Sequence, residues 1–480
     1  MLQSPAILRQ RNIVMDTNWT PDLSRHEGPK YLALVRALRE GIRQGELPPG
    51  TQVPTVRDLA WRIKVTPGTV ARAYHIATQE GLLDATVGRG TFVADTGRRF
   101  GPSQSLFIER VAIRDANMMD LRSPRLPDVG QVERIAEALR QAADSAGPEW
   151  MGYPSQHDEF ALRAALCDWI GERDLGPVSP DDLALTHGGQ SAINLVFQCC
   201  LRGDRPLILI EELAYPGFRH AARLNRADIA GIEMDDHGLR PDALDAACRK
   251  SPAQILCLTC EGQNPTTLRM PAERRAEIAE VARRHDLQII DDECYGPEGD
   301  ATPGMRAFAP ERTWHVGSLS KTVSPALRFG YVFCPRGMGE AGRMTAQHGF
   351  FALAKPMSDA ILNLLQSGAA AQIRADVRAE TNLRLSIATR AFDGFDLHWR
   401  ADLPYVWLRL PNGWRASTFA RMAEGQGVLV RSADEFALFN GRPPHAVRIA
   451  LAGDTDPDLL ARALDRLSTA LRHPPEDVAV

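Results

Sequence analysis

The hydrophobic positions of the first hundred residues predict three short helices. A first set of apolar residues recurs at helical spacing: Tyr31, Leu34, Val35, Leu38 and Ile42. Gly45 ends that helix, and a second helix is predicted over about 56–63. Thr66 suits an N-cap and Pro67 suits the first turn of a third helix, which runs to about Glu80.

A glycine-rich basic hairpin follows the third helix. Gly81 ends the helix, and two apolar stretches, 82–83 and 91–93, flank the tip Gly88-Arg89-Gly90. Helix, helix, turn, helix and basic hairpin is the order of a winged helix-turn-helix. The alternative is a generic three-helix domain with solvated arginines.

In a winged helix-turn-helix the third helix enters the major groove of DNA. We therefore expect Thr69 and Arg72, on its exposed side, to face the bases. Arg57, at the start of the second helix, is expected to meet phosphate. Arg89 and Gly90 at the tip of the wing are expected to reach phosphate or the minor groove.

Beyond residue 120 the pattern changes to apolar runs that alternate with amphipathic helices. The strand-like runs lie at 206–210, 254–259, 287–291 and 313–316. This alternation predicts an α/β fold with a mostly parallel sheet, whose ligands bind at the carboxyl ends of the strands. The candidate chemistry of this chain follows those strand ends.

A lysine lies among small hydroxyl residues directly after the last of these runs. Lys321 sits between Ser320 and Thr322, with Ser318 before it and Arg328 seven positions on. A lysine that forms a Schiff base must be partly desolvated beside a carbonyl cofactor. Hydroxyls and a guanidinium can hold a phosphate. Taken alone, a surface lysine in a serine-rich loop is an equally good interpretation.

Other strand ends carry side chains suited to a planar phosphorylated cofactor. Gly189 and Gln190 open a helix, where backbone N–H groups favour phosphate. Tyr215 can lie against a ring face. Asn264 can donate to a phenolate oxygen, and the carboxylate of Asp292 can keep a pyridine nitrogen protonated.

These motifs, in this order over about 186–330, resemble fold-type-I aminotransferases that use pyridoxal 5′-phosphate (PLP). The resemblance implies that Lys321 forms the internal aldimine with PLP and that Asp292 pairs with its pyridinium. It implies further cofactor contacts, which are Gly189, Gln190, Tyr215, Asn264, Tyr295, Ser318, Ser320 and Arg328.

The same resemblance extends to three residues outside that stretch. Arg448 matches the arginine that clamps the substrate carboxylate, and Tyr153 matches the tyrosine that reaches the phosphate of the neighbouring subunit. Thr267 stands where a glycine often follows Asn-Pro-Thr.

Residues 25–95 resemble the GntR-type DNA-binding domain, and the fusion of this domain to an aminotransferase-like body resembles the MocR family of bacterial regulators. This resemblance implies a head-to-tail homodimer that binds double-stranded operator DNA and senses an amino compound as an aldimine with PLP. Two alternatives stay open: a working aminotransferase with an accessory DNA-binding domain, and a sensor of PLP itself.

The resemblance and the composition together predict four segments. They are a tail at 1–24, the winged helix at 25–95, a linker at 96–117, and the PLP-binding domain at 118–480. That domain is expected to divide into a large subdomain of about 150–350 and a small one. The small subdomain should comprise about 351–480 and part of 118–149.

The distribution of charge and the number of cysteines give further indications of the class of protein. Residues 25–99 carry 12 Lys and Arg against 7 Asp and Glu, although the whole chain has a net charge of −4. A basic block on an acidic body indicates a polyanion-binding module. Eight cysteines in 480 residues make no disulfide framework, and the pair Cys257 and Cys260 is read as buried thiols without a metal.

No apolar run approaches the roughly 20 residues of a membrane span. The first 19 residues also lack a signal-peptide core, so we expect a cytoplasmic location and no membrane contact.

Overall fold

The computed structural model describes residues 19–26, 29–79, 82–86, 90–94, 118–171, 173–296, 302–438 and 443–472. The chain divides into two compact units, Met1–Ser105 and Leu106–Val480. The predicted linker at 96–117 lies outside the described residues, as does the predicted element near 106–114. None of the described helices combines the length and apolar character that a membrane span requires.

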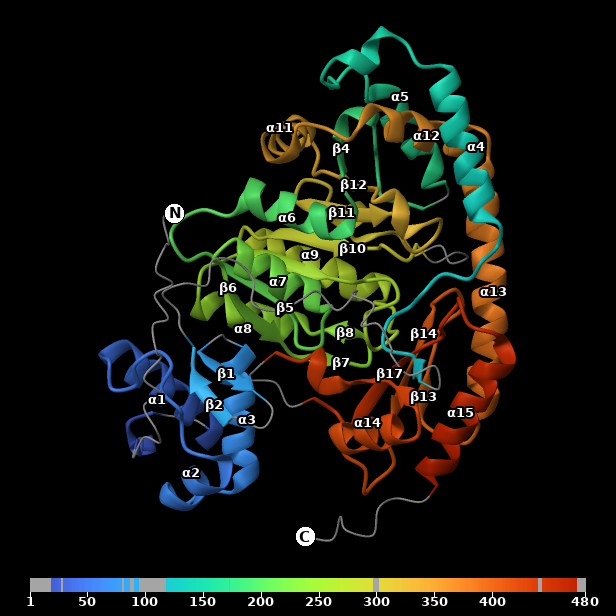
Figure 1. Ribbon diagram of the computed structural model, residues 1–480. Coiled ribbons are helices and arrows are strands. Elements are labelled where there is room, and N and C mark those ends of the chain that lie inside the picture. The colour runs from blue at the N-terminus through green and yellow to red at the C-terminus, as the bar shows by residue number, and fades with distance from the viewer. Residues whose placement is uncertain are drawn as a thin grey trace, which may run out of the picture. The chain divides into compact units, whose positions relative to one another are not determined.

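The N-terminal unit contains the helices and the hairpin that its sequence predicts (Figure 1). Its elements are η1 (Leu23–Arg25), α1 (Lys30–Gln44), α2 (Val56–Arg62), α3 (Pro67–Gln79), β1 (Leu83–Thr86) and β2 (Gly90–Val93). Gly45 ends α1 in the left-handed conformation, at φ 80°. The Thr66 hydroxyl accepts from the backbone N–H of Thr69 at 3.3 Å, which is the N-cap expected for α3.

The C-terminal unit is built on a seven-stranded sheet among its described residues, in the order β4-β12-β11-β10-β9-β5-β6. The strands are β4 (Leu183–Thr186), β5 (Leu207–Glu211), β6 (Asp228–Ile232), β9 (Ala253–Leu258), β10 (Gln288–Asp292), β11 (Thr313–Ser318) and β12 (Gly330–Phe333). β12 runs antiparallel to both neighbours, while the pairs from β11 to β6 are parallel. The expected mostly parallel sheet is confirmed.

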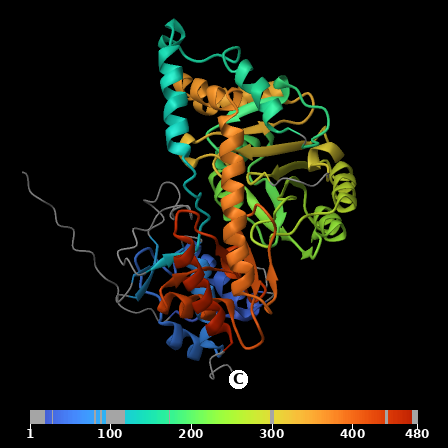
Figure 2. The ribbon, with the colours of Figure 1, turned by 90° about the vertical axis from the view of Figure 1, so that its right-hand side faces the viewer.

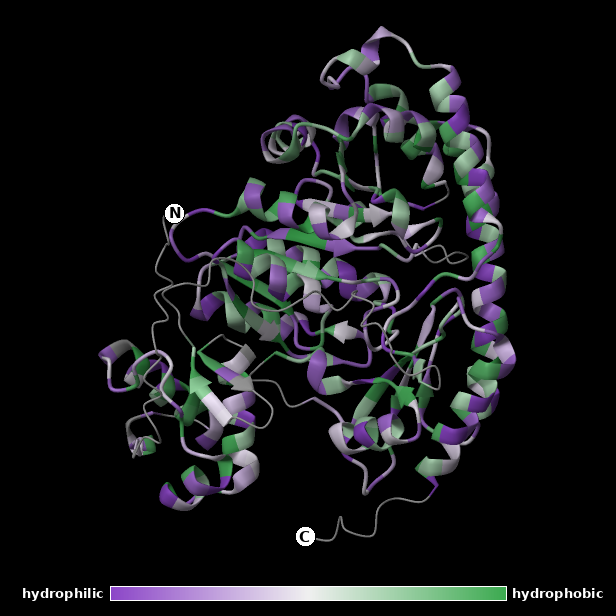
Figure 3. Ribbon diagram, in the orientation of Figure 1, coloured by the Kyte–Doolittle hydropathy of each residue, from purple (hydrophilic) through white to green (hydrophobic). Residues whose placement is uncertain are grey.

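Alternate residues of each strand pack on opposite faces of this sheet. Ile210, Cys257 and Trp314 pack with α6 (Gly189–Cys200) and α7 (Pro216–Leu224). Leu209, Leu256 and Ile289 pack with α8 (Pro241–Lys250) and α9 (Ala272–Arg284) on the other face. Because helices cover both faces, the central strands are apolar almost throughout (Figure 3).

The edge of the sheet at β4 and β12 packs against a group of helices. They are α4 (Gln131–Asp144), α5 (Phe160–Trp169), α12 (Lys355–Gln366) and the start of α13 (Ala369–Ala391). The other elements of this subdomain are η2 (Pro148–Met151), η3 (Pro180–Asp182), β7 (Met234–Asp235), β8 (Gly238–Leu239), α10 (Met305–Phe308), η4 (Pro325–Leu327) and α11 (Gly339–Phe350).

A smaller sheet forms the second subdomain, in the order β13-β14-β17-β16. Its elements are β13 (Leu397–His398), β14 (Tyr405–Arg409), α14 (Ala416–Gly425), β15 (Val428–Leu429), β16 (Arg431–Ser432), η5 (Ala433–Glu435), β17 (Ala446–Ala450) and α15 (Pro457–Leu471). β3 (Met119–Asp120) pairs with β15 and so ties the start of the unit to this subdomain. The long helix α13 runs from the large subdomain to the small one, where it packs on α15 (Figure 2).

Two glycines of α11 differ sharply in the space around them, which allows a matched test of this packing. A Cβ at Gly339 would lie 1.8 Å from the carbonyl oxygen of Asp181, whereas a Cβ at Gly349 would lie 3.7 Å from its nearest neighbour, a side-chain oxygen of Gln198. We predict that Gly339→Ala lowers the free energy of unfolding by about 1–3 kcal/mol, because the backbone must shift. Gly349→Ala should instead raise it by about 0.5–1 kcal/mol. Urea midpoints of the two variants measure the difference, and equal midpoints would contradict the packing described.

Candidate functional site

The strand ends bring Lys321 close to an acidic strand terminus. Lys321 follows β11 and is half-buried, and β11 pairs with β10 so that Asp292 lies opposite Val316. Burial lowers the pKa of the Lys321 amine, and the positive charges of Arg448 and Arg328 lower it further, against the acidic neighbours Cys294 and Asp292. A lysine with a lowered pKa has more of its nucleophilic neutral amine at neutral pH.

The carboxylate of Asp292 is held by the turn that follows β10. Its Oδ1 accepts from the backbone N–H of Cys294 at 3.1 Å, and the Cys294 thiol is a second hydrogen-bond partner. Burial raises the pKa of Asp292, while these hydrogen bonds and the nearby Lys321 oppose the rise. A desolvated carboxylate of this kind is stabilised by a cation placed against it, such as a protonated ring nitrogen.

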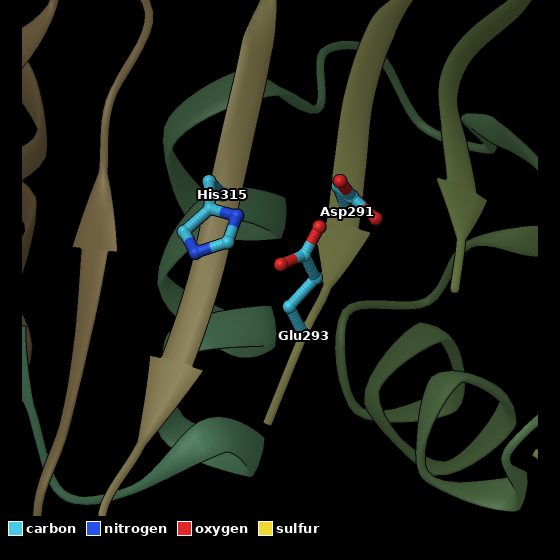
Figure 4. Close-up of side chains that lie close together, drawn as sticks. All are labelled: Asp291, Glu293 and His315. Carbon is cyan, nitrogen blue, oxygen red and sulfur yellow. The ribbon is translucent and has the colours of Figure 1, made fainter. Parts of the chain in front are cut away.

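Two neighbouring acids and a histidine form a separate buried cluster (Figure 4). Ligand atoms of Asp291, Glu293 and His315 lie within 4.8 Å of one another. Asp291 accepts from the backbone N–H groups of Cys260 at 3.2 Å and Met305 at 3.3 Å, and Glu293 forms a bidentate pair with Arg173. These partners satisfy both carboxylates, so the cluster is a structural support beneath the strand end.

The electrostatics of this cluster follow from its partners. Burial and the adjacent Glu293 raise the pKa of Asp291, whereas Arg173 and His315 keep the pKa of Glu293 low despite burial. Burial lowers the pKa of His315 to about 4. Glu293 is therefore the ionised carboxylate of the cluster, and it faces the Arg173 guanidinium.

A backbone cradle lies at the N-terminus of α6. A Cβ at Gly188 would lie 2.8 Å from Nη2 of Arg328, and a Cβ at Gly189 would lie 2.6 Å from the sulfur of Cys294. Arg328 donates to the carbonyl oxygen of His187 at 2.9 Å, which fixes its guanidinium beside the turn. Glycines, helix N–H groups and a cation together suit a phosphate.

The serines of the lysine segment differ in their hydrogen bonds. The Ser318 hydroxyl donates to the carbonyl oxygen of Phe329 at 2.9 Å and accepts from the backbone N–H of Ser320 at 3.0 Å. The Ser320 hydroxyl is buried and has no hydrogen-bond partner among the described residues. The Ser318 hydroxyl therefore already donates a hydrogen bond, whereas the Ser320 hydroxyl has no acceptor among the described residues.

Tyr215 and Gln190 hold each other at the start of α7. The Tyr215 hydroxyl donates to Oε1 of Gln190 at 3.3 Å, and Nε2 of Gln190 donates to the carbonyl oxygen of Gly217 at 3.0 Å. A Cβ at Gly217 would lie 2.0 Å from the Tyr215 ring, so the ring depends on glycine at that position.

Arg448 on β17 reaches from the small subdomain to the large one. Its Nη1 donates to Oδ1 of Asn264 at 2.6 Å, and its Nη2 donates to the carbonyl oxygen of Arg122 at 2.7 Å. The guanidinium lies 5.3 Å from the ring centroid of Tyr405, which in turn lies edge-on to Tyr295 at 5.4 Å. Arg448, Asn264 and Tyr295 therefore share one neighbourhood.

Thr267 has a positive φ of 65° and is buried. A β-branched residue is strained in the left-handed region, which glycine adopts without cost. This conformation gives the physical reason why a glycine is the expected residue there.

Tyr153 lies apart from these side chains within the chain. Its side chain is 85% exposed, and its ring stacks on Phe351 at 5.4 Å with 20° between the planes. Within one chain it makes no part of the Lys321 neighbourhood described above.

The candidate DNA contacts lie on the exposed sides of α2 and α3. Arg57 and Arg72 are exposed, and the Arg72 guanidinium lies 4.0 Å from the ring centroid of Tyr31 on α1. The Thr69 hydroxyl is half-buried and shares a 2.9 Å hydrogen bond with that of Thr66. Gly90 is exposed with φ 107°, and Arg89 lies outside the described residues.

The residues of the C-terminal unit fit PLP. The glycine cradle is closed to any Cβ, and the Ser320 hydroxyl and Nε of Arg448 are buried without a hydrogen-bond partner among the described residues. The cradle suits the phosphate, Asp292 suits the ring nitrogen, and the Lys321 amine suits the aldehyde.

Two groups at this site were not predicted from the sequence. Cys294 lies between Asp292 and Tyr295, and its position two residues after the aspartate at a strand end was a usable signal. The carbonyl oxygen of Arg122 had no signal, because any residue supplies a backbone carbonyl.

Both units match known protein families. Residues 116–467 match the family Aminotransferase class I and II, and residues 30–93 match the Bacterial regulatory proteins, gntR family. The chain is 28% identical over 437 residues to the uncharacterized HTH-type transcriptional regulator YdeF of Bacillus subtilis (strain 168), covering 90% of this chain and 92% of that protein. It is 25% identical to the probable rhizopine catabolism regulatory protein MocR of Rhizobium meliloti, over 64% of this chain and 66% of that one.

Solved structures support the same fold. A kynurenine aminotransferase of Pyrococcus horikoshii superposes with a TM-score of 0.66 at 19% identity, covering 74% of this chain and 91% of that one. The chain therefore belongs to the aminotransferase class I and II family, and it joins this fold to an N-terminal domain that matches the gntR family.

Proposed function

We propose that this protein is a PLP-dependent transcription regulator that binds operator DNA and responds to an amino compound. The observation that carries the proposal is the presence, in one chain, of a winged helix and a half-buried lysine near Asp292 and a phosphate cradle. The names of relatives such as YdeF and MocR, which describe regulators, support the same function.

When bound, PLP supplies an aldehyde that links covalently to amines and a ring that withdraws electrons. The Lys321 amine, kept partly neutral by burial, is the group that would hold it. Asp292 would keep the ring nitrogen protonated, and Tyr295 and Asn264 would approach the ring oxygen. Gly189, Gln190, Ser320 and Arg328 would hold the phosphate, with Ser318 orienting the segment through Phe329.

Arg448 provides a route from ligand to conformation. It now spans Asn264 in the large subdomain and Arg122 near β3. A carboxylate on an amino compound would accept hydrogen bonds from both Nη1 and Nη2 of Arg448 in a bidentate pair, and so would compete with these contacts. The ligand would shift the two subdomains only to the extent that it binds their arrangements with different affinity.

A head-to-tail homodimer is part of the proposal. Tyr153 is exposed beside Met151, which is also exposed, and both lie on the segment around η2. Large apolar side chains on one surface are typical of an interface. A dimer would present two recognition helices and would read repeated half-sites.

A working aminotransferase is the second candidate. The half-buried Lys321, with Asp292 among its charged neighbours, and an intact Arg448 would serve turnover as well as sensing. Spectra recorded with an amino donor separate the two. A persistent shifted band supports a sensor, and conversion to the amine form of the cofactor, reversed by a keto acid, supports an enzyme.

We predict that Lys321→Ala removes the visible absorbance band of the PLP-loaded protein, because the variant has no amine at that position. Retention of the band would refute the assignment of Lys321. Lys355→Ala is a matched control, since Lys355 lies on α12 and pairs with Asp359, and it should leave the band unchanged.

We predict that Arg72→Ala raises the Kd for DNA about tenfold, because one groove contact is worth about 1–3 kcal/mol. The probe is a duplex selected by the full-length protein from a random library, and fluorescence anisotropy measures the affinity. Arg39→Ala on the exposed side of α1 is the control and should change the Kd less than twofold. Equal effects of both substitutions would remove Arg72 from the interface.

We also predict that the affinity of the full-length protein for this duplex falls steeply with salt concentration. Phosphate contacts release condensed cations, so the logarithm of the affinity should fall linearly with the logarithm of the salt concentration. A flat response would contradict a role for the basic residues of the winged helix.

A further inference from the structure

A buried glutamine side chain directly precedes Asn264 in the turn after β9. Gln263 is 1% exposed. Its Nε2 donates to Oε2 of Glu211 at 3.2 Å and to the carbonyl oxygen of Leu213 at 2.5 Å. Its Oε1 accepts from the backbone N–H of Thr266 at 3.0 Å and from the Thr266 hydroxyl at 2.6 Å. A primary amide has two N–H donors and an oxygen with two lone pairs, so these contacts use the full capacity of the group.

The backbone of Gln263 holds the same turn. Its N–H donates to the carbonyl oxygen of Leu268 at 2.8 Å, and its carbonyl oxygen accepts from the N–H of Thr267 at 2.7 Å. The Tyr405 hydroxyl lies 3.3 Å from that carbonyl oxygen and donates to it. Because these partners lie on both sides of Gln263, they fix the position from which the Asn264 side chain extends.

The Gln263 side chain joins two neighbouring strand ends of the large sheet. β5 and β9 are paired, β5 ends at Glu211, and the chain continues through Leu213 to Tyr215. The Gln263 amide contacts Glu211 and Leu213, so it fixes the turn that carries Asn264 against the segment that leads to Tyr215. Asn264 and Tyr215 are both candidate contacts of the cofactor ring.

The amide of Asn264 is oriented from its other side by Arg448. Its Oδ1 accepts from Nη1 of Arg448 at 2.6 Å, and Asn264 is 6% exposed. Its Nδ2 has no acceptor among the described residues. Since Oδ1 faces a guanidinium, Nδ2 is the group that can donate to a ring oxygen. Buried donors in folded proteins normally have partners, and a bound ring would supply one here.

We propose that Gln263 is a positioning residue, whose side-chain hydrogen bonds hold the turn so that Nδ2 of Asn264 is directed to the ring oxygen of PLP. This inference rests on the proposed function, because it concerns the cofactor that Lys321 would hold. Without the Gln263 amide, the buried partners on Glu211, Leu213 and Thr266 lose this contact, and the turn shifts to satisfy them.

A donor at the ring oxygen has a spectroscopic signature. The visible band of the PLP-loaded protein changes with pH when the nitrogen that joins PLP to Lys321 loses its proton. A hydrogen bond from Asn264 stabilises the negative charge that increases on the ring oxygen at that step, and so lowers the pH midpoint of the change. Asn264→Ala should therefore raise the midpoint, and so should any substitution that turns Nδ2 of Asn264 away.

Other titratable and charged groups also face this region, and they remain unchanged in the variants compared. Glu211, which contacts Gln263, has its pKa raised to about 8 by burial, and the hydrogen bond from Gln263 opposes this rise. The groups around Lys321 and Arg448 are Asp292, Cys294, Tyr295, Tyr405, Arg328, Arg431 and Glu435.

The test is a double-mutant cycle on the PLP-loaded full-length protein. Gln263→Met keeps the length of the side chain and removes its amide, and we expect it to raise the midpoint by about one unit, as for the loss of a hydrogen bond to a charged group. The double variant of Gln263→Met with Asn264→Ala should lie within about 0.2 units of Asn264→Ala alone, because both substitutions remove the same contact. A midpoint of Gln263→Met within about 0.2 units of the wild type, or fully additive shifts, would overturn the inference.

Two further variants separate positioning from general stability. Gln288 lies at the start of β10 and accepts from the Trp314 indole N–H at 3.0 Å. Gln288→Met is the matched control, which should lower the urea midpoint and leave the pH midpoint unchanged. Thr266→Val removes the hydroxyl that donates to Gln263 and leaves the contact with Glu211 in place, so a rise in its pH midpoint cannot come from Glu211. This variant also keeps the test valid if Gln263→Met does not fold.

The outcomes distinguish this inference from the proposed function. If the wild-type protein shows no visible band with PLP, the proposed cofactor fails, and this inference fails with it. If the band is present and its midpoint moves in Asn264→Ala but in neither Gln263→Met nor Thr266→Val, the inference alone is wrong. If Asn264→Ala itself leaves the midpoint unchanged, Asn264 does not donate to the ring oxygen, and the role proposed for Gln263 is wrong as well.

Discussion

Three consecutive acids, Asp291, Asp292 and Glu293, end a buried strand, and the site depends on how their charges are accommodated. Side chains alternate along a strand, so Asp292 lies on the opposite face from its two neighbours. Asp291 is satisfied by backbone N–H groups and Glu293 by Arg173. Among the described residues, the hydrogen bonds to the Asp292 carboxylate come from the backbone N–H and the thiol of Cys294.

This arrangement explains why a costly cluster of buried charges persists behind a cofactor site. An unpaired buried carboxylate would take a proton, and the turn after β10 would lose its anchors. With Arg173 and the backbone as partners, the turn that carries Cys294 and Tyr295 keeps its position. The register of β10 against β11 then places Asp292 opposite Val316, on the strand that leads into the Lys321 segment.

The periodic parts of the molecule could be predicted from sequence, because helices and strands repeat a local rule. The winged helix follows from Leu34 and Leu38 on one helix face and from Thr66 as a cap, and the strand ends placed Asp292 and Lys321 together. The membership of Arg374 and Arg378 in a pocket beside Lys321 could not be predicted. These arginines lie some fifty residues beyond Lys321, and only the path of α13 brings them there.

The backbone conformation of Thr267 and the contact between Arg448 and Asn264 could not be predicted from the sequence either. The sequence showed Thr267 in the place of a glycine, but its positive φ is a property of the turn that Gln263 and Thr266 stabilise. The pairing of Arg448 with Asn264 likewise depends on how two subdomains meet.

The contacts of Arg448 constrain what a ligand can do. Arg448 on β17 connects the small subdomain to Asn264 in the large one and to the carbonyl oxygen of Arg122. A carboxylate that accepts hydrogen bonds from this guanidinium competes with both contacts, so its binding free energy depends on the relative position of the two subdomains. Because a ligand shifts a conformational equilibrium only through such differential contacts, the exchange of these hydrogen bonds is what would make a bound amino compound an effector.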